Sequence, residues 1–252
     1  MTALRAEFGY FLGAVQFLTR LPVPDQGNFT AEWLDRSVKY FPLAGLIVGA
    51  ISAAVLLAAS VLWSGVLPAL LAVAAGIAAT GAFHEDGFAD FFDAMGGTNR
   101  EARLAIMKDS RLGTFGATAL GMDIALKVLA LAALAPAAAA GALIAAHAGG
   151  RFAAIMAMAY LPYAGDGSTA KPKPLATNIT ARGLAIAACF AMPPLVLLSF
   201  PAGLIACLAG FAAAIFMAWR AKRLLGGFTG DALGAIEQSY EIAFLLGVAA
   251  WI

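Results

Sequence analysis

Charged side chains are scarce in this sequence of 252 residues. Asp, Glu, Lys and Arg make up 12% of the chain, whereas hydrophobic residues make up 62%. The charged share is about half of that in an ordinary soluble domain. So little polar surface cannot cover a water-soluble globule, which excludes that class of protein. The composition indicates a polytopic membrane protein.

The sequence also has only two cysteines and two histidines, and it has almost no surplus of basic over acidic residues. Of the two cysteines, Cys189 and Cys207, neither has metal-ligand or redox spacing, and both lie in apolar segments. We therefore expect two reduced, buried thiols without a function. The formal net charge is only +1. This charge argues against a nucleic-acid partner, because no basic surplus is available to neutralise a phosphate backbone.

The apolar residues are gathered into segments long enough, or nearly long enough, for the roughly 20 residues that cross a bilayer. We predict an all-α fold with about seven transmembrane helices in a single catalytic domain over residues 1–252. The stretch from Phe8 to Leu18 is shorter and ends before Arg20 and Pro22, which predicts an interfacial or re-entrant helix. The predicted spans lie at about 40–63, 66–83, 115–135, 138–162, 183–200, 203–219 and 236–252.

Lysine and arginine are distributed unevenly between the connections. The short connections near Ser64, Pro136 and Pro201 have none, and of the sixteen Lys and Arg residues only Lys127 and Arg151 lie inside a predicted span. By the positive-inside rule, the N-terminal region and the cation-bearing loops are cytoplasmic. We therefore predict that the candidate chemical groups share one side of the membrane, the cytoplasmic side. These loops cover residues 84–114, 163–182 and 220–235.

Four carboxylates fall within ten residues, directly after the predicted span at 66–83. On a helix that advances roughly 100° per residue, Asp86, Asp90 and Asp93 lie within roughly 60° of one another, and Glu85 points away. Such a face repels itself without a counter-charge, and hard oxygen ligands suit Mg²⁺ carrying a phosphorylated substrate. We predict that these three aspartates bind Mg²⁺. The alternative is a solvated helix end that marks the membrane boundary.

His84 precedes this acidic face and projects toward its phenylalanine side. It is as suited to orienting a neighbour as to acting as a base.

A second segment, residues 108–116, combines two cations, two hydroxyls and two glycines at a predicted helix start. Free backbone N–H groups and the helix dipole favour anions there, so we predict a phosphate cradle. The alternative is a basic membrane-anchoring loop with Thr114 as helix N-cap. The candidate residues are Lys108, Asp109, Ser110, Arg111, Gly113 and Thr114.

A third segment, residues 226–235, has four glycines in nine residues but fits neither a Walker nor a Rossmann pattern. We expect a flexible loop that brings main-chain donors against a phosphate or a base, with Asp231 as a further metal or ribose ligand. The other candidates in it are Gly227, Thr229 and Gly230. Farther along, Glu237 and Glu241 either face the site or cap a helix N-terminus.

Two pairs of ionisable residues, each four apart, lie inside predicted spans, where charge is costly. They are Asp123 with Lys127 and His147 with Arg151. One reading is that Arg151, alone or with Lys127, reaches a substrate phosphate. The other is an ion-pair network that fixes helix packing, which we favour for Asp123.

Together these segments resemble the adenosylcobinamide-GDP ribazoletransferase family, the cobalamin(-5′-phosphate) synthases. The resemblance implies a Mg²⁺-dependent membrane transferase that joins adenosylcobinamide-GDP to α-ribazole or its 5′-phosphate and releases GMP. Phe88, often Leu in the family, and Asp123 depart from its motifs. The matching segments, in chain order, are FLTRLPVP, YFPLAGLIVG, FHEDGFADFFDAMGG, RLAIMKDSRLGTFG, Arg151 and GGFTGDALGA with its trailing glutamates.

The resemblance also implies roles for these residues. Metal held by the three aspartates would neutralise the diphosphate, Lys108 and Arg111 would add positive charge, and the 226–235 loop would bind the nucleotide or the ribazole phosphate. Arg20 is a further substrate-binding candidate. The proton acceptor is left open among Asp231, Glu237 and His84. Expected partners are the corrinoid nucleotide, α-ribazole and the lipid bilayer, with a homo-oligomer or other cobalamin-assembly enzymes as further candidates.

Three other kinds of protein share some of these features. A CDP-alcohol phosphotransferase needs a longer acidic motif with four aspartates, and a UbiA-type prenyltransferase usually has two separate acidic clusters. A transporter would concentrate its ionisable groups near the membrane midplane, whereas most lie at one interface here. The sequence therefore favours the transferase.

Overall fold

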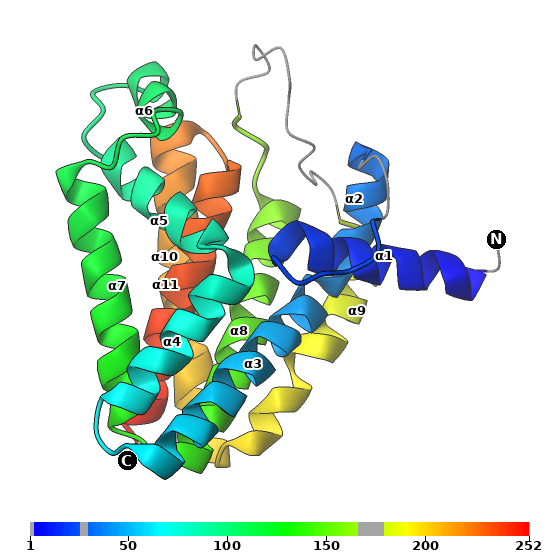
Figure 1. The fold of residues 1–252 in the computed structure, drawn as a ribbon. Coiled ribbons are helices and arrows are strands. Elements are labelled where there is room, and N and C mark those ends of the chain that lie inside the picture. The colour runs from blue at the N-terminus through cyan, green and yellow to red at the C-terminus, as the bar shows by residue number, and fades with distance from the viewer. Residues whose placement is uncertain (1–2, 26–29, 166–178, 252) are drawn as a thin grey trace.

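In a computed structural model the chain is helical throughout the residues that the structure describes, 3–25, 30–165 and 179–251 (Figure 1). An isolated parallel β-bridge between Tyr163 and Phe228 is the one strand-like feature within these ranges. The all-α prediction is confirmed. The helices are α1 (Ala3–Leu18), α2 (Ala31–Ser37), η1 (Val38–Tyr40), α3 (Phe41–Leu62), α4 (Leu67–Thr80), α5 (Phe83–Ala94), α6 (Arg100–Met107), α7 (Thr114–Ala132), α8 (Pro136–Tyr160), α9 (Ala181–Ala191), η2 (Pro193–Leu197), α10 (Phe200–Leu225) and α11 (Gly230–Ala249).

Four helical segments are long and apolar enough to cross a bilayer, namely 31–62, α7, α8 and α10. Counting α4 and α5 as one bent span gives five, and α9 with η2 forms a shorter apolar segment. The prediction of about seven spans is therefore not confirmed. The last predicted span, near 236, belongs to α11, which begins at Gly230 and carries three acidic residues.

Of the described connections, those from α5 to α7 and from α10 to α11 lie at one end of the bundle, with Lys and Arg in or beside them (Figure 1). At this end lie α6, the start of α7 and the start of α11, and α1 runs across the long helices near it. The turns from α3 to α4 and from α7 to α8 lie at the opposite end, with the C-terminus. Much of the predicted 163–182 loop, residues 166–178, lies outside the described residues.

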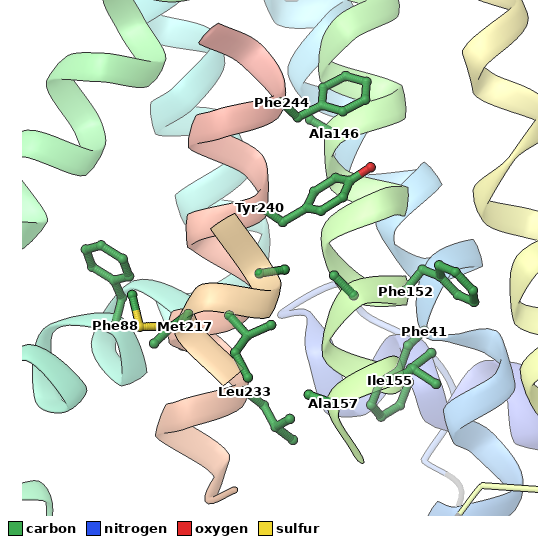
Figure 2. Packing of buried hydrophobic residues seen from close by; sticks show 14 of the residues in the cluster. Phe41, Phe88, Ala146, Phe152, Ile155, Ala157, Met217, Leu233, Tyr240 and Phe244 are labelled. Carbon is green, nitrogen blue, oxygen red and sulfur yellow. The ribbon is translucent and has the colours of Figure 1, made fainter. Parts of the chain in front are cut away.

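The long helices approach closely because small residues line their contacts. Tyr240 of α11 reaches toward α8 (Figure 2), where a Cβ added to Gly149 would lie 2.5 Å from its hydroxyl. On the other side of the ring, a Cβ on Gly210 of α10 would lie 2.8 Å from Tyr240 Cε2. The two glycines thus make the slot that this buried tyrosine fills between three helices.

A tight turn separates α4 from α5 and bends the pair by 91°. Gly81 and Ala82 both have left-handed backbones, with φ of 68° and 57°. Arg20 donates its backbone N–H to Ala79 O at 2.7 Å, and its side chain covers Gly81. The bend turns α5, with its four carboxylates, away from the direction of α4.

One expectation about the cysteines is wrong. Cys189 is exposed on α9 and Cys207 is half-buried on α10; both are free thiols. Cys189 lies on the outer side of a short apolar helix, and an apolar sequence does not by itself tell that side from the inner one.

Candidate active site

The N-terminal turn of α11 packs directly on α5. A Cβ on Gly87 would lie 2.9 Å from Asp231 Cα, and one on Gly234 would lie 3.0 Å from the His84 carbonyl oxygen. Only glycine permits such a close approach of two backbones. The contact brings Asp231 to the acidic face of α5.

Asp86, Asp90 and Asp93 share one side of α5, together with Asp231 of α11. Asp86 is exposed and Asp90 is half-buried. Partial burial, followed by the negative charges of Asp231, Asp86 and Asp93, raises the pKa of the Asp90 carboxyl to about 7. The four carboxylates therefore form one electrostatically coupled group.

Asp93 has a further contact that its position in the helix did not predict. Its Oδ2 accepts the backbone N–H of Gly113 and its Oδ1 that of Gly116, both at 2.7 Å. The anion at the start of α7 is thus a carboxylate of the protein itself. Because the N-cap of α7 is Gly113 and Thr114 is the first helical residue, the alternative prediction of Thr114 as N-cap is wrong.

The loop before α7 presents its cation at the surface. Arg111 is exposed and donates from Nη2 to Asp109 Oδ2 at 2.6 Å and from Nε to Oδ1 at 3.0 Å. These hydrogen bonds hold the pKa of the Asp109 carboxyl at about 2. Lys108 and Ser110 are exposed beside this pair. The contacts with Asp109 use Nε and Nη2 of Arg111, so its Nη1 can still donate to a substrate oxygen.

The glycine-rich segment is an ordered turn and not the flexible loop expected. Gly226 ends α10 with φ of 86°, and Phe228 donates its backbone N–H to Pro162 O at 2.9 Å. Gly227 packs so tightly on the Pro162 carbonyl that a Cβ would collide with it. The Thr229 hydroxyl caps α11 by accepting the Ala232 N–H at 3.1 Å. Gly230 is the first residue of α11.

Arg151 is buried at the centre of an ion-pair network between α8 and α11. Its Nη1 lies 2.7 Å from Glu237 Oε1, 3.0 Å from Glu241 Oε1 and 3.2 Å from His147 Nδ1. Both glutamates lie well inside α11, so the prediction that they cap its N-terminus is wrong. These contacts agree with the second prediction for Arg151, an ion-pair network that fixes helix packing.

Lys127 extends the same network to α7. Its ammonium lies 3.2 Å from Asp123 Oδ1 and 3.1 Å from Glu241 Oε2, and it also donates to Gln238. The favoured prediction for Asp123, a packing role, agrees with this arrangement. Gln238 in turn donates to Glu85 Oε1 at 3.4 Å. Glu85 therefore belongs to the buried network, away from the aspartates, as the helical projection predicts.

His147, Glu237 and Glu241 form a group that could hold a metal ion, since one ligand atom from each lies within 4.8 Å of the others. The Arg151 guanidinium, however, lies within hydrogen-bonding distance of all three side chains. A cation of the protein already compensates this group. The acidic face of α5 and Asp231 are better suited to a metal, because no such guanidinium contact satisfies Asp90 or Asp86 among the described residues.

Comparison with known proteins identifies the family. The profile of the cobalamin-5-phosphate synthases, CobS, matches residues 10–249. The chain belongs to this family. A family member named adenosylcobinamide-GDP ribazoletransferase, from Leptothrix cholodnii, is 42% identical over 262 residues, covering 100% of this chain and 99% of the relative.

Two more CobS relatives have the same name. The relative from Shewanella piezotolerans is 38% identical, and the match covers 98% of this chain and 96% of the relative. A relative from Vibrio cholerae is 37% identical, and the match covers 99% of this chain and 96% of the relative. No solved structure matches the chain. The predicted family resemblance is confirmed, and the assignment as a transferase of cobalamin biosynthesis follows from it.

Sequence reasoning missed two residues that link the elements around this candidate site. Arg100 donates to Leu225 O at 2.7 Å and to Ala164 O at 2.8 Å, so it links the end of α10 to the segment that follows α8. Gln238 links the networks of α5, α7 and α11. In the sequence, Gln238 stands out only as a polar residue inside an apolar segment, and no sequence pattern marks Arg100.

Proposed function

We propose that this chain transfers the cobinamide phosphate of adenosylcobinamide-GDP to α-ribazole, or to α-ribazole 5′-phosphate, with release of GMP. The names of its CobS relatives support these substrates. The observation that carries the proposal is the convergence of the α5 aspartates and Asp231 beside the start of α7. A transferred diphosphate needs positive charge at such a place.

Asp86, Asp90 and Asp231 would hold Mg²⁺, with Asp93 contributing through the lone pairs that its two backbone hydrogen bonds leave. The donor set fits, because carboxylate oxygens are the ligands that Mg²⁺ prefers. Burial, and after it repulsion by the other three carboxylates, raises the pKa of Asp90, and a bound cation would relieve that repulsion. Bound there, the ion would neutralise charge on the diphosphate and on the departing GMP.

The transfer forms one phosphorus–oxygen bond and breaks another. A ribose hydroxyl of α-ribazole attacks the cobinamide-side phosphorus, and the anhydride bond to GMP breaks. Asp231, where it does not ligate the metal, would accept the hydroxyl proton, because Glu237 is paired with Arg151 and His84 lies in the buried interior. Lys108 and Arg111 would bind the phosphate oxygens from the loop before α7.

We place the site on the cytoplasmic side of the bacterial inner membrane. Support comes from the Lys- and Arg-rich connections, which share the end of the bundle at which the acidic face lies (Figure 1). The Arg20 side chain at the α4–α5 turn lies at the same end and is exposed, so it is available to a substrate.

The direct test measures GMP release by purified protein in detergent with Mg²⁺, adenosylcobinamide-GDP and α-ribazole. We expect release by the wild type and a loss of at least about a hundredfold in Asp90→Asn, with unfolding unchanged. Glu101→Gln removes an exposed carboxylate of α6 and serves as the matched control. A wild type that releases no GMP, or a fully active Asp90→Asn variant, would overturn the proposal.

A further inference from the structure

Two adjoining hollows lie at a corner of the bundle that the acidic site does not use. At this corner α1 lies across the long helices, η1 leads into α3, and α9 packs on both η1 and α3 (Figure 1). An open apolar groove of about 570 Å³ runs beside α1, and a polar pocket of about 470 Å³ lies between α1, the α2–η1 segment and α9. Glu7 and Tyr40 line both hollows, so the two form one continuous surface.

The described residues that line the polar pocket include more cations than acids. Lys39 Nζ is paired with Glu7 Oε2 at 2.6 Å. Arg36 is exposed and donates from Nη1 to the Tyr10 hydroxyl at 3.1 Å, so its Nε and Nη2 can donate to a ligand. Arg182 lines the same pocket from the start of α9 and is also exposed. Two guanidinium groups are thus placed to bind an anion.

The sequence and the aromatic side chains both indicate that these cations lie at the membrane boundary. Lys39 is the last charged residue before the apolar helix α3, and Arg182 is the last before the uncharged stretch 183–200. Lys39 Nζ also lies 5.7 Å from the ring centroid of Tyr10 and 5.2 Å from that of Tyr40. Tyrosines are enriched where a bilayer meets water. The polar pocket therefore lies at the depth of lipid headgroups.

The apolar groove is suited to an acyl chain. Leu4, Phe8 and Phe11 follow one another at spacings of four and three residues, so they share one face of α1, and Leu43 of α3 lines the groove with them. Leu4 is 82% exposed and Phe8 is 60% exposed. Such a face is typical of a helix that lies in the membrane interface, with lipid tails against its apolar side. Because the groove joins the polar pocket, one molecule can occupy both.

We propose that this corner binds one anionic phospholipid, with the phosphate on Arg36 and Arg182 and an acyl chain in the groove beside α1. The described residues that line the two hollows include four cations and two acids, Arg5 being the fourth cation. A lipid with a net negative charge is attracted by this surplus more strongly than a zwitterionic one. A soluble phosphate compound would meet the same guanidinium groups but would leave the groove uncovered.

The test compares two lipids that differ only in their headgroup. Native mass spectrometry of the full chain in detergent measures the binding of phosphatidylglycerol and of phosphatidylcholine with the same acyl chains. We expect the wild type to bind phosphatidylglycerol about tenfold more tightly, and the double variant Arg36→Gln with Arg182→Gln to lose most of that preference. The charge-matched control is Lys222→Gln with Arg223→Gln, which removes two exposed cations from the end of α10 and should keep the preference.

Two further measurements separate the headgroup from the acyl chain. Phe8→Ser should weaken the binding of both lipids alike, because it changes the groove and not the polar pocket. Glycerol 3-phosphate, which has the phosphate without the chains, should not displace phosphatidylglycerol at equal concentration. Because Arg36, Arg182 and Phe8 are exposed, we expect the lipid-free variants to unfold at the wild-type temperature.

Three results would overturn the inference. The first is equal binding of the two lipids by the wild type, and the second is an unchanged preference in the Arg36→Gln, Arg182→Gln variant. The third is displacement of the lipid by glycerol 3-phosphate, which would make the corner a site for a soluble phosphate compound. None of these outcomes depends on GMP release, so they are independent of the proposed function.

Discussion

Gly116 of α7 donates its backbone N–H to the Asp93 carboxylate of α5 at 2.7 Å, and Gly113 donates to the other oxygen at the same distance. One carboxylate thus joins the acidic helix to the start of the next helix. The helix dipole favours a negative charge at this position. The contact sets where α7 lies relative to Asp86 and Asp90.

Gly116→Ala should break this connection. Its Cβ would collide with the Asp93 carboxylate and lie 2.7 Å from Ala89 O, so we expect a loss of about 1–2 kcal/mol, as for a lost helix cap, and reduced GMP release. Thermal unfolding in detergent measures the first effect. The control is Gly121→Ala on the same helix, where an added Cβ meets nothing within 4 Å. Equal unfolding temperatures for the two variants would contradict the prediction.

The sequence predicted those features of the site that depend on one helix. The convergence of Asp86, Asp90 and Asp93, and the divergence of Glu85, follow from 100° per residue alone. The approach of Asp231 depends on a tertiary contact between Gly87 and α11, which no local pattern encodes. For the same reason the second role of Asp93 was not predictable.

Helix ends were harder to predict than helix existence. The apolar run at 66–83 continues through the point where Gly81 and Ala82 turn the chain, because hydrophobicity does not report backbone conformation. Glu237 and Glu241 were placed near a helix start, but α11 extends seven residues before Glu237, which puts both acids in the buried network. Arg100 and Gln238 act through partners distant in sequence.

Divalent-metal binding should weaken as the pH falls below about 7. The pKa of the Asp90 carboxyl is raised to about 7, so above this pH the group is ionised and available, and below it a proton competes with the metal. We expect Mn²⁺ affinity, followed by the loss of the free-ion electron paramagnetic resonance signal, to fall by at most about tenfold per pH unit for one proton. Glu101→Gln should follow the wild-type curve. Asp90→Asn should bind weakly with a flatter profile, and an equally steep profile in that variant would refute the assignment.

The left-handed turn before α5 should be sensitive to a side chain. Gly65 and Gly81 both have positive φ, 75° and 68°, but a Cβ on Gly65 meets nothing within 4 Å, whereas one on Gly81 would lie 2.5 Å from Arg20 Nε. Gly65→Ala should cost about 1–2 kcal/mol from backbone strain alone. Gly81→Ala should cost more and lower activity, because it displaces Arg20 and the start of α5. Equal costs in chemical unfolding would show that Arg20 does not restrain the turn.

Arg151→Met should severely destabilise the protein, because it leaves Glu237 and Glu241 with one cation fewer in the interior. Breaking a buried pair typically costs about 3–5 kcal/mol. The double variant Arg151→Met with Glu237→Gln should recover part of that stability, since it removes the Glu237 charge that lost its Arg151 partner, while Glu241 keeps Lys127. A double-mutant cycle of unfolding free energies in detergent measures the coupling between the 2.7 Å partners. If Arg151→Met unfolds like the wild type and only substrate binding is lost, the guanidinium serves the substrate and not the packing of α8 on α11.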